Sequence, residues 1–270
     1  MLDKIIVSTD DSMFSQYVPV VSAAWKRFFP ECELNIAYVT NRSDDDEYVN
    51  RMRRYGKVYL YRPVDNIPLA NQAKVVRHIL ASQFGDKICM IEDIDTIPLQ
   101  RAYFEDRISK RKPNHVLAIG AEVFDGTPHA GKFPMSNITA EGRVFKEFIN
   151  PDSLKYDDLV RSWVDLSIMD HKEAINSLPS NFSDESLIRA LLSKWDDSRV
   201  MHVARDVDIH NEWIDRSWWS VDEDKLERGV YIICNLLRPL DKYYKQVEPV
   251  IEYIFDNETD ETSYEDTILL

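Results

Sequence analysis

The amino-acid sequence predicts an α/β fold, in which helices cover both faces of a mostly parallel sheet. Three observations lead to this prediction. Short apolar segments alternate with amphipathic segments over the first hundred residues, which is typical of strand–helix–strand units. Hydrophobic residues make up 44% of the chain and aromatic residues 11%, enough for a sizeable core. No internal repeat, low-complexity segment or obvious linker interrupts the 270 residues, so we expect a single Rossmann-like domain.

The first hundred residues are expected to contain four strands, at 4–9, 34–40, 58–61 and 88–91. Helices are expected between them, at 15–29, after Ser43 and at 71–83. In an open parallel sheet, ligands bind beyond the carboxyl ends of the strands. Thr9, Asp10 and Asp11 end the first predicted strand, and Asp93 and Asp95 follow the fourth. We therefore expect both groups at one edge of the sheet.

The remainder of the chain is less regular. Strands are expected at 116–121 and 200–204 and an apolar run at 230–237, with helices at 142–149, 183–195 and 240–255. The glycine-rich stretch 120–134 is interpreted as a loop. Residues 256–270 form an acidic C-terminal tail, interpreted as solvated.

The charge is strongly negative: 47 acidic residues against 33 basic ones give a formal net charge of −14. Such a surface repels phosphate backbones, so nucleic acid is not expected as a partner. A nucleotide substrate remains compatible, because a bound divalent cation can reverse the local field. The three cysteines have no motif spacing, and the sequence contains no signal segment and no run long enough for a transmembrane helix. We expect a cytoplasmic, reducing compartment.

Asp93 and Asp95 are the strongest candidates for chemistry. Residues two apart in extended chain point the same way, so both carboxylates can face one cleft. Two such close anions are costly unless they are protonated or bridged by a cation. Carboxylate oxygens suit Mg²⁺ or Mn²⁺, which also bind phosphate oxygens. The alternative without function is that Asp93 and Asp95 are solvated residues at the beginning of a loop.

Several segments, taken in order, resemble GT-A glycosyltransferases over about residues 4 to 250. The metal motif of that family is matched by Asp93-Ile94-Asp95-Thr96-Ile97-Pro98-Leu99, and the other matching segments are 4–11, 71–77, 183–187, Asp215-Arg216-x-x-Trp219, Tyr231-Ile232 and Leu237-Arg238-Pro239. The chain departs from the family at Asn235, where related enzymes often carry a metal-binding histidine. An amide oxygen is a poorer ligand.

The resemblance implies transfer of a sugar from a nucleotide-diphosphate sugar to a hydroxyl acceptor such as a glycan, with Mn²⁺ or Mg²⁺ as cofactor. It places the metal at Asp93, Asp95 and Asn235. It places the donor at Thr9, Asp10, Asp11, Lys74, Arg77, Asp93 and Arg238. The acceptor-side base would be Asp184, with Glu185 beside it, which implies inversion at the anomeric carbon. The domain would span 1–255, with a donor-binding half at about 1–100 and an acceptor half at about 101–255.

Two other readings stay open. The same letters could present Asp93 as the nucleophile of a haloacid-dehalogenase-like phosphatase, with Asp95 as general acid and Asp196-Asp197 as the later acidic pair. A non-catalytic carbohydrate-binding protein would use aromatic side chains such as Trp213, Trp218 and Trp219 and would not need Asp95. Core packing is the commoner use of such aromatic clusters.

Overall fold

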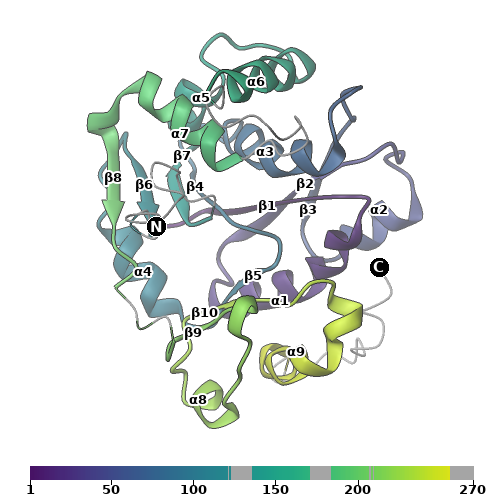
Figure 1. Cartoon of the computed structure of the whole chain (residues 1–270), viewed down its shortest axis with the longest axis vertical. Coiled ribbons are helices and arrows are strands. Elements are labelled where there is room, and N and C mark those ends of the chain that lie inside the picture. The colour runs from purple at the N-terminus through teal and green to yellow at the C-terminus, as the bar shows by residue number, and fades with distance from the viewer. Residues whose placement is uncertain (121, 123–135, 171–183, 207, 209, 256–270) are drawn as a thin grey trace.

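A seven-stranded sheet forms the centre of the molecule, in the order β3-β2-β1-β4-β7-β6-β8 (Figure 1). The computed structural model describes all residues except 121, 123–135, 171–183, 207, 209 and 256–270. The seven strands are β1 (Lys4–Asp10), β2 (Glu33–Val39), β3 (Lys57–Tyr61), β4 (Ile88–Ile91), β6 (Val116–Ile119), β7 (Ile138–Glu141) and β8 (Val200–Val203).

The sheet is mostly parallel, as the sequence predicts. β1 pairs in parallel with both β2 and β4, and β6 pairs in parallel with β8. β7 runs antiparallel to its two neighbours β4 and β6. β4, β6 and β8 therefore point the same way as β1, and their carboxyl ends share one edge of the sheet.

Helices cover both faces of this sheet, and the apolar side chains divide into two cores. Along β1, Ile5 and Val7 belong to one core and Ile6 to the other, because successive side chains of a strand point to opposite faces. Figure 1 shows α1 and α9 on one side and α3, α5, α6 and α7 on the other. The helices of these two layers are α1 (Val18–Phe28), α3 (Leu69–Ala81), α5 (Gly142–Ile149), α6 (Tyr156–Asp170), α7 (Asp184–Trp195) and α9 (Leu240–Phe255).

Shorter elements connect the layers. They are η1 (Met13–Tyr17), α2 (Glu47–Met52), α4 (Arg101–Ser109), η3 (Asp197–Arg199), η4 (Arg216–Trp218) and α8 (Glu223–Glu227). The helix expected at 15–29 is thus divided, with α1 beginning at Val18. Pro19 lies in the first turn of α1, where its missing N–H costs no intrahelical bond.

A second, three-stranded sheet follows the acidic motif directly. It consists of β5 (Thr96–Pro98), β10 (Ile233–Asn235) and β9 (Trp213–Ile214), with β10 in the middle. Asp95 therefore joins the large sheet to the small one. Its carbonyl oxygen accepts a 2.8 Å hydrogen bond from the backbone N–H of Leu236, just past β10.

Most of the glycine-rich loop and all of the acidic tail lie outside the described residues. No helix within the described part of the chain is both long and apolar enough to cross a bilayer. The three cysteines are free thiols.

Candidate functional site

The acidic motif forms a turn at the carboxyl edge of the sheet. β4 ends at Ile91, and a 3.1 Å hydrogen bond from the Thr96 N–H to the Asp93 carbonyl closes the turn before β5 begins. The Asp93 side chain is 32% exposed, whereas that of Asp95 is 1% exposed. One carboxylate thus faces outward, and the other lies beneath neighbouring side chains.

Two arginines from distant parts of the chain cover Asp95. Arg216, the first residue of η4, donates from Nη1 to Asp95 Oδ2, and Arg238, which follows β10, donates from Nε to the same oxygen. The arginine side chains are 29% and 39% exposed. Each guanidinium is therefore held from beneath by a buried carboxylate while part of it remains open to solvent.

A third arginine holds Asp93. Arg77 of α3 is 3% exposed, and its Nη1 donates to Asp93 Oδ1 at 2.6 Å and to the Glu92 carbonyl at 2.7 Å. Burial alone would raise the pKa of Asp93. The guanidinium of Arg77, with those of Arg238 and Arg216, instead holds that pKa below its usual range.

Glu92 is fully buried behind the pair. Burial, and the charge of Asp93 beside it, raise the pKa of Glu92 well above its usual range. Its Oε1 accepts a 3.1 Å hydrogen bond from the Asn137 N–H on the way into β7. These surroundings favour the neutral form of Glu92 behind the pair.

These surroundings leave few free oxygens for a divalent cation. Hard cations need several free oxygens, but Asp93 Oδ1 is bonded to one guanidinium and Asp95 Oδ2 to two. Among the described residues, Asp95 Oδ1 and Asp93 Oδ2 accept no hydrogen bond, and the first of these oxygens is buried. No group of three or more His, Cys, Asp or Glu side chains within the described ranges could hold a metal ion. Three cations against two carboxylates also leave the contacting groups net positive.

Asn235, which stands where the resemblance implies a metal-binding histidine, lies next to the acidic turn. β10 pairs antiparallel with β5, with Asn235 opposite Thr96. Asn235 Oδ1 accepts a 3.3 Å hydrogen bond from the Thr96 hydroxyl, and Nδ2 donates to Asp215 Oδ2 at 3.4 Å. The amide thus links the small sheet to the residue that caps η4. Its role as a metal ligand stays a prediction.

Tyr17 fixes the segment that carries Arg238. Its hydroxyl donates to the Leu237 carbonyl at 2.7 Å, and the Arg238 guanidinium lies 5.1 Å from the ring centre of Phe14. Burial, and next the negative charge of Asp95, raise the pKa of Tyr17, so it remains a neutral donor. Neither Tyr17 nor Arg216 was among the expected site residues, although Arg216 lies in a segment that matches the family.

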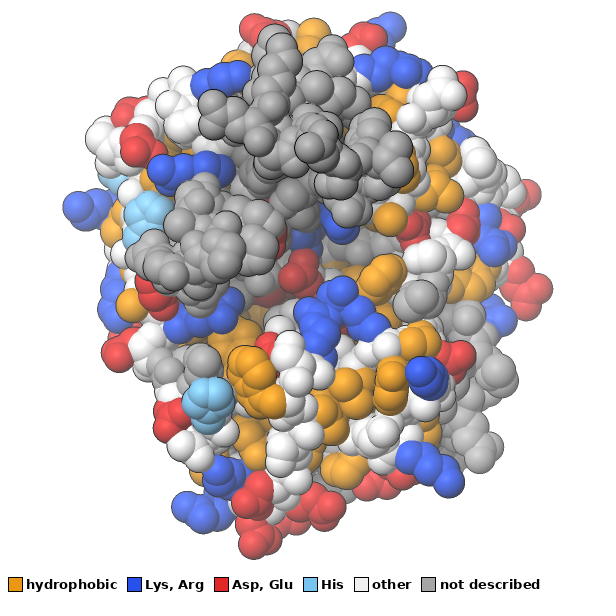
Figure 2. Space-filling model, viewed as in Figure 1, with side chains coloured by type: hydrophobic (Ala, Val, Ile, Leu, Met, Phe, Trp, Pro, Cys, Tyr) orange, Lys and Arg blue, Asp and Glu red, His pale blue; other side chains and the backbone are white. Residues whose placement is uncertain are grey.

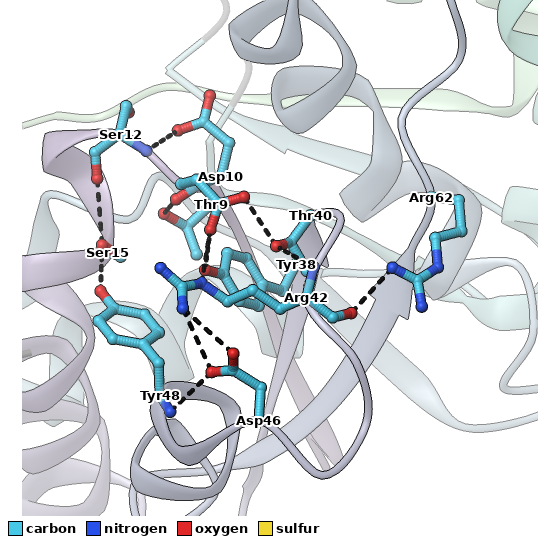
Figure 3. A network of polar contacts seen from close by, with 11 residues as sticks. Thr9, Asp10, Ser12, Ser15, Tyr38, Thr40, Arg42, Asp46, Tyr48 and Arg62 are labelled. Carbon is cyan, nitrogen blue, oxygen red and sulfur yellow. Dashed lines mark hydrogen bonds and ion pairs between the residues drawn. The ribbon is translucent and has the colours of Figure 1, made fainter.

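The residues after β1 form a second polar network (Figure 3). Asp11 accepts hydrogen bonds from the hydroxyl groups of Tyr38 and Thr40, at 2.5 and 2.7 Å, and from Arg42 Nε at 2.9 Å. Burial alone would raise the pKa of Asp11. The three hydrogen bonds together outweigh this effect and hold the pKa below its usual range. Asp11 therefore ties the end of β1 to the end of β2.

The other donor-side residues are placed differently. Asp10 is buried, and its Oδ1 accepts the Ser12 N–H at 2.9 Å. Thr9 is buried beside it in β1. Lys74 is exposed on α3, one turn before Arg77. The structure thus places Asp10 and Asp93 at the ends of the adjacent strands β1 and β4, as the sequence predicts.

Asp184 and Glu185 are the first two residues of α7. Glu185 is partly buried, and the Asp184 side chain lies outside the described residues. Leu187 and Ile188 of the same helix belong to the core that α3 also lines. The catalytic role of this pair stays a prediction.

The acidic residues that a phosphatase site would need lie at opposite edges of the large sheet. Asp196 caps η3, immediately before β8, and Asp197 is in η3 itself. β8 runs in the same direction as β4, so residues before β8 lie at the amino edge and Asp93 at the carboxyl edge. Asp196 and Asp197 cannot complete a site around Asp93 in this arrangement.

The three tryptophans at 213, 218 and 219 do not form one cluster. Trp213 is buried in the small sheet, and Trp219 Nε1 donates to the Gln246 carbonyl at 3.2 Å. Trp218 is 46% exposed, with its ring 5.5 Å from that of His210. Trp218, the last residue of η4, is therefore the most exposed of these three tryptophans.

The face seen in Figure 1 is hollowed near its centre, where Lys and Arg side chains gather around acidic ones (Figure 2). Two hollows of about 440 and 420 Å³ lie elsewhere. One is lined by residues of α3, α5 and the start of α6, the other by residues of α5, α6 and α7. Neither includes a residue of the acidic turn.

No family model matches the sequence, and no curated protein matches it. Solved structures do match. The galactosyltransferase LgtC in complex with donor and acceptor sugar analogs has a TM-score of 0.52 at 10% identity, covering 98% of this chain and 99% of that one. An active-site variant of LgtC also gives 0.52 at 10% identity, with coverages of 91% and 95%. Together with the mostly parallel sheet and its flanking helices, this likeness shows that the chain has the GT-A glycosyltransferase fold.

Proposed function

We propose that this chain is a glycosyltransferase that moves a sugar from a nucleoside-diphosphate sugar to a hydroxyl acceptor. The observation that carries the proposal is the cluster of Asp93, Asp95 and three arginines at the carboxyl edge of a GT-A sheet. Open α/β sheets bind nucleotides at this edge. Fixed cationic donors are what a departing diphosphate requires.

The reaction breaks the bond between the anomeric carbon and the diphosphate oxygen and forms a bond from that carbon to the acceptor oxygen. The diphosphate leaves with the electron pair. The acceptor hydroxyl loses its proton, and we assign that proton to the carboxylate of Asp184, with Glu185 as the neighbouring alternative. A base on the acceptor side implies inversion at the anomeric carbon.

On the donor side, Asp10 is assigned to the nucleoside, because it ends β1 at the carboxyl edge of the sheet, beside the network around Asp11. Asp11 supports this position through Tyr38, Thr40 and Arg42. Lys74 is assigned to the outer side of the diphosphate. Trp218 offers an aromatic face on which the acceptor sugar can stack.

The test is a panel of nucleoside-diphosphate sugars, assayed for release of nucleoside diphosphate with and without a mixture of hydroxyl acceptors. Every reaction is run both in Mn²⁺ and in EDTA, so that activity is scored independently of metal dependence. We expect acceptor-stimulated release with one donor class. If none of the panel reacts but a sugar alone raises the unfolding temperature, the chain is a carbohydrate-binding protein and the proposal is wrong.

A further inference from the structure

Three guanidinium groups contact the carboxylates of Asp93 and Asp95, where the family resemblance would place a metal. We propose that Arg77, Arg216 and Arg238 form a metal-independent binding site for a diphosphate, with Arg216 and Arg238 making the direct contacts. The inference deepens the proposed function, on which it rests for the identity of the natural ligand. Binding of a diphosphate can nevertheless be tested without any sugar transfer.

The first argument is positional. Arg216 and Arg238 arrive from η4 and from the segment after β10, and each gives one nitrogen to Asp95 Oδ2. Asp95 is 1% exposed, so it serves as a buried anchor and not as a group available to a ligand. Tyr17 restrains the segment of Arg238 from the other side. Both guanidinium groups are thus oriented before any ligand arrives.

The second argument concerns the donors that remain. A guanidinium has five N–H donors in a rigid fork, and Asp95 engages one nitrogen of each arginine. The side chains are 29% and 39% exposed, so part of each fork faces solvent. Phosphate oxygens are suited to such forks, because two parallel N–H···O bonds can form.

The third argument is the balance of charge. The contacting groups comprise three guanidinium cations and the carboxylates Asp93 and Asp95, so the cluster carries one net positive charge. Asp215 lies nearby, where its carboxylate accepts the Ser217 N–H and the amide of Asn235, and it is not among the groups in contact with the three guanidinium groups. A divalent cation would compete with guanidinium groups that already pair with both carboxylates. A diphosphate is an anion, so the guanidinium groups attract it.

The probe for this site is inorganic pyrophosphate, titrated calorimetrically into the full chain in excess EDTA. We expect saturable binding in the wild type. Arg216→Gln and Arg238→Gln should each weaken it by about tenfold or more, the scale of a lost charge-assisted hydrogen bond. Arg216→Lys and Arg238→Lys should weaken it less, because the charge remains and the fork is lost.

The matched control is Arg101→Gln. Arg101 is 38% exposed and pairs with Glu31, which precedes β2 and so lies at the amino edge of the sheet. Its loss should leave pyrophosphate affinity within about twofold of the wild type, the scatter expected for surface changes outside the site. Thermal unfolding accompanies every titration. If a Gln variant is unfolded, its Lys counterpart carries the test, and a measurable loss of affinity is expected because the charge is retained without its fork.

Pyrophosphate binding by the wild type that appears with Mn²⁺ and is absent in EDTA would overturn the proposal. So would folded Gln or Lys variants that bind as tightly as the wild type. Failure of the proposed function looks different. Arginine-dependent binding of pyrophosphate in EDTA, without turnover of any sugar nucleotide, leaves the diphosphate site standing and removes the transferase. Sugar transfer that requires Mn²⁺ would leave the transferase standing and remove the metal-independent diphosphate site.

Discussion

Asp11 illustrates how a single carboxylate can serve the site by holding other side chains in place. Its folded-state pKa is lowered by Tyr38, Thr40 and Arg42, so it stabilises the fold above its unfolded pKa of about 3.9. That stability is lost as the pH falls through the lower folded pKa. We expect Asp11→Asn to unfold at lower urea than the wild type at pH 6, with the difference shrinking below about pH 4. A constant difference between pH 6 and pH 3 would contradict the assigned pKa shift.

Gly120 is a second residue with a specific structural demand. Its φ is +81°, its N–H donates to the Val203 carbonyl at 2.8 Å, and an added Cβ would meet the Arg205 side chain. We expect Gly120→Ala to lower the free energy of unfolding by about 1 to 3 kcal/mol, measured in urea. Gly85→Ala is the matched control, since Gly85 has a φ of +56° but open space around its Cβ position. Equal losses in both variants would mean that the Arg205 side chain yields freely.

The carboxylates of the candidate site could be predicted from the sequence, and the family resemblance added Arg77 and Arg238, but neither identified Arg216 or Tyr17 as a site residue. Asp93 and Asp95 were expected from their spacing at the end of an apolar strand, and Asp10 from its place after the first strand. The partners of Asp95 are 121 and 143 residues away, in segments with no strong periodic pattern. Their approach depends on how the small sheet packs against the large one, which residue spacing does not encode.

Helix α7 is the element on which the catalytic assignment depends. A general base contributes about 10²- to 10⁴-fold to rate, so Asp184→Asn should lose turnover on that scale at saturating donor. Donor affinity, measured by calorimetry, should change little. Proton NMR of the first-formed product should show the anomeric configuration opposite to that of the donor.

Glu185→Gln is the matched variant for that prediction. If it is inactive while Asp184→Asn is active, the helix start is correct and the base is Glu185. A loss of about 1 kcal/mol in stability without a loss of rate would identify Asp184 as a helix cap. Retention of configuration would overturn the base assignment for both residues.

At the level of elements, most long periodic segments were predictable and the short or irregular ones were not, although α6, a helix of 15 residues, was also missed. β1 to β4, α3 and α9 lie within about two residues of their expected positions, because each is a clear apolar or amphipathic run. β5, β9 and β10 have three, two and three residues, which is too few to show the alternation of apolar and polar side chains that predicts a strand. α4 was missed because its buried side chains, Tyr103 and Phe104, are adjacent and form no helical stripe.

At the scale of the whole molecule, the question is how much of the C-terminal end of the chain the fold needs. Val250, Ile251 and Ile254 of α9 are at most 2% exposed and belong to the core. A chain ending after Phe255 should therefore keep the unfolding free energy of the full chain, measured in urea. A chain ending after Glu248 should lose about 5 kcal/mol or more, since each such side chain contributes about 1.5 to 3 kcal/mol on burial. A large loss in the longer truncation would give residues 256–270 a structural role.

The ion pairs of Asp95 also impose an order of events during synthesis. The ribosome adds about 5 to 20 residues per second, so Arg238 leaves it about 7 to 30 s after Asp95. Until then, burying Asp95 against β5 would leave one carboxylate without its counter-charges, which folding disfavours strongly. The nascent chain can pair β1 with β2 and β3 early, because those contacts are local. The turn that carries Asp95 must stay hydrated until the segment after β10 emerges, so a ribosome stalled before Arg238 should display a chain that cannot yet retain pyrophosphate.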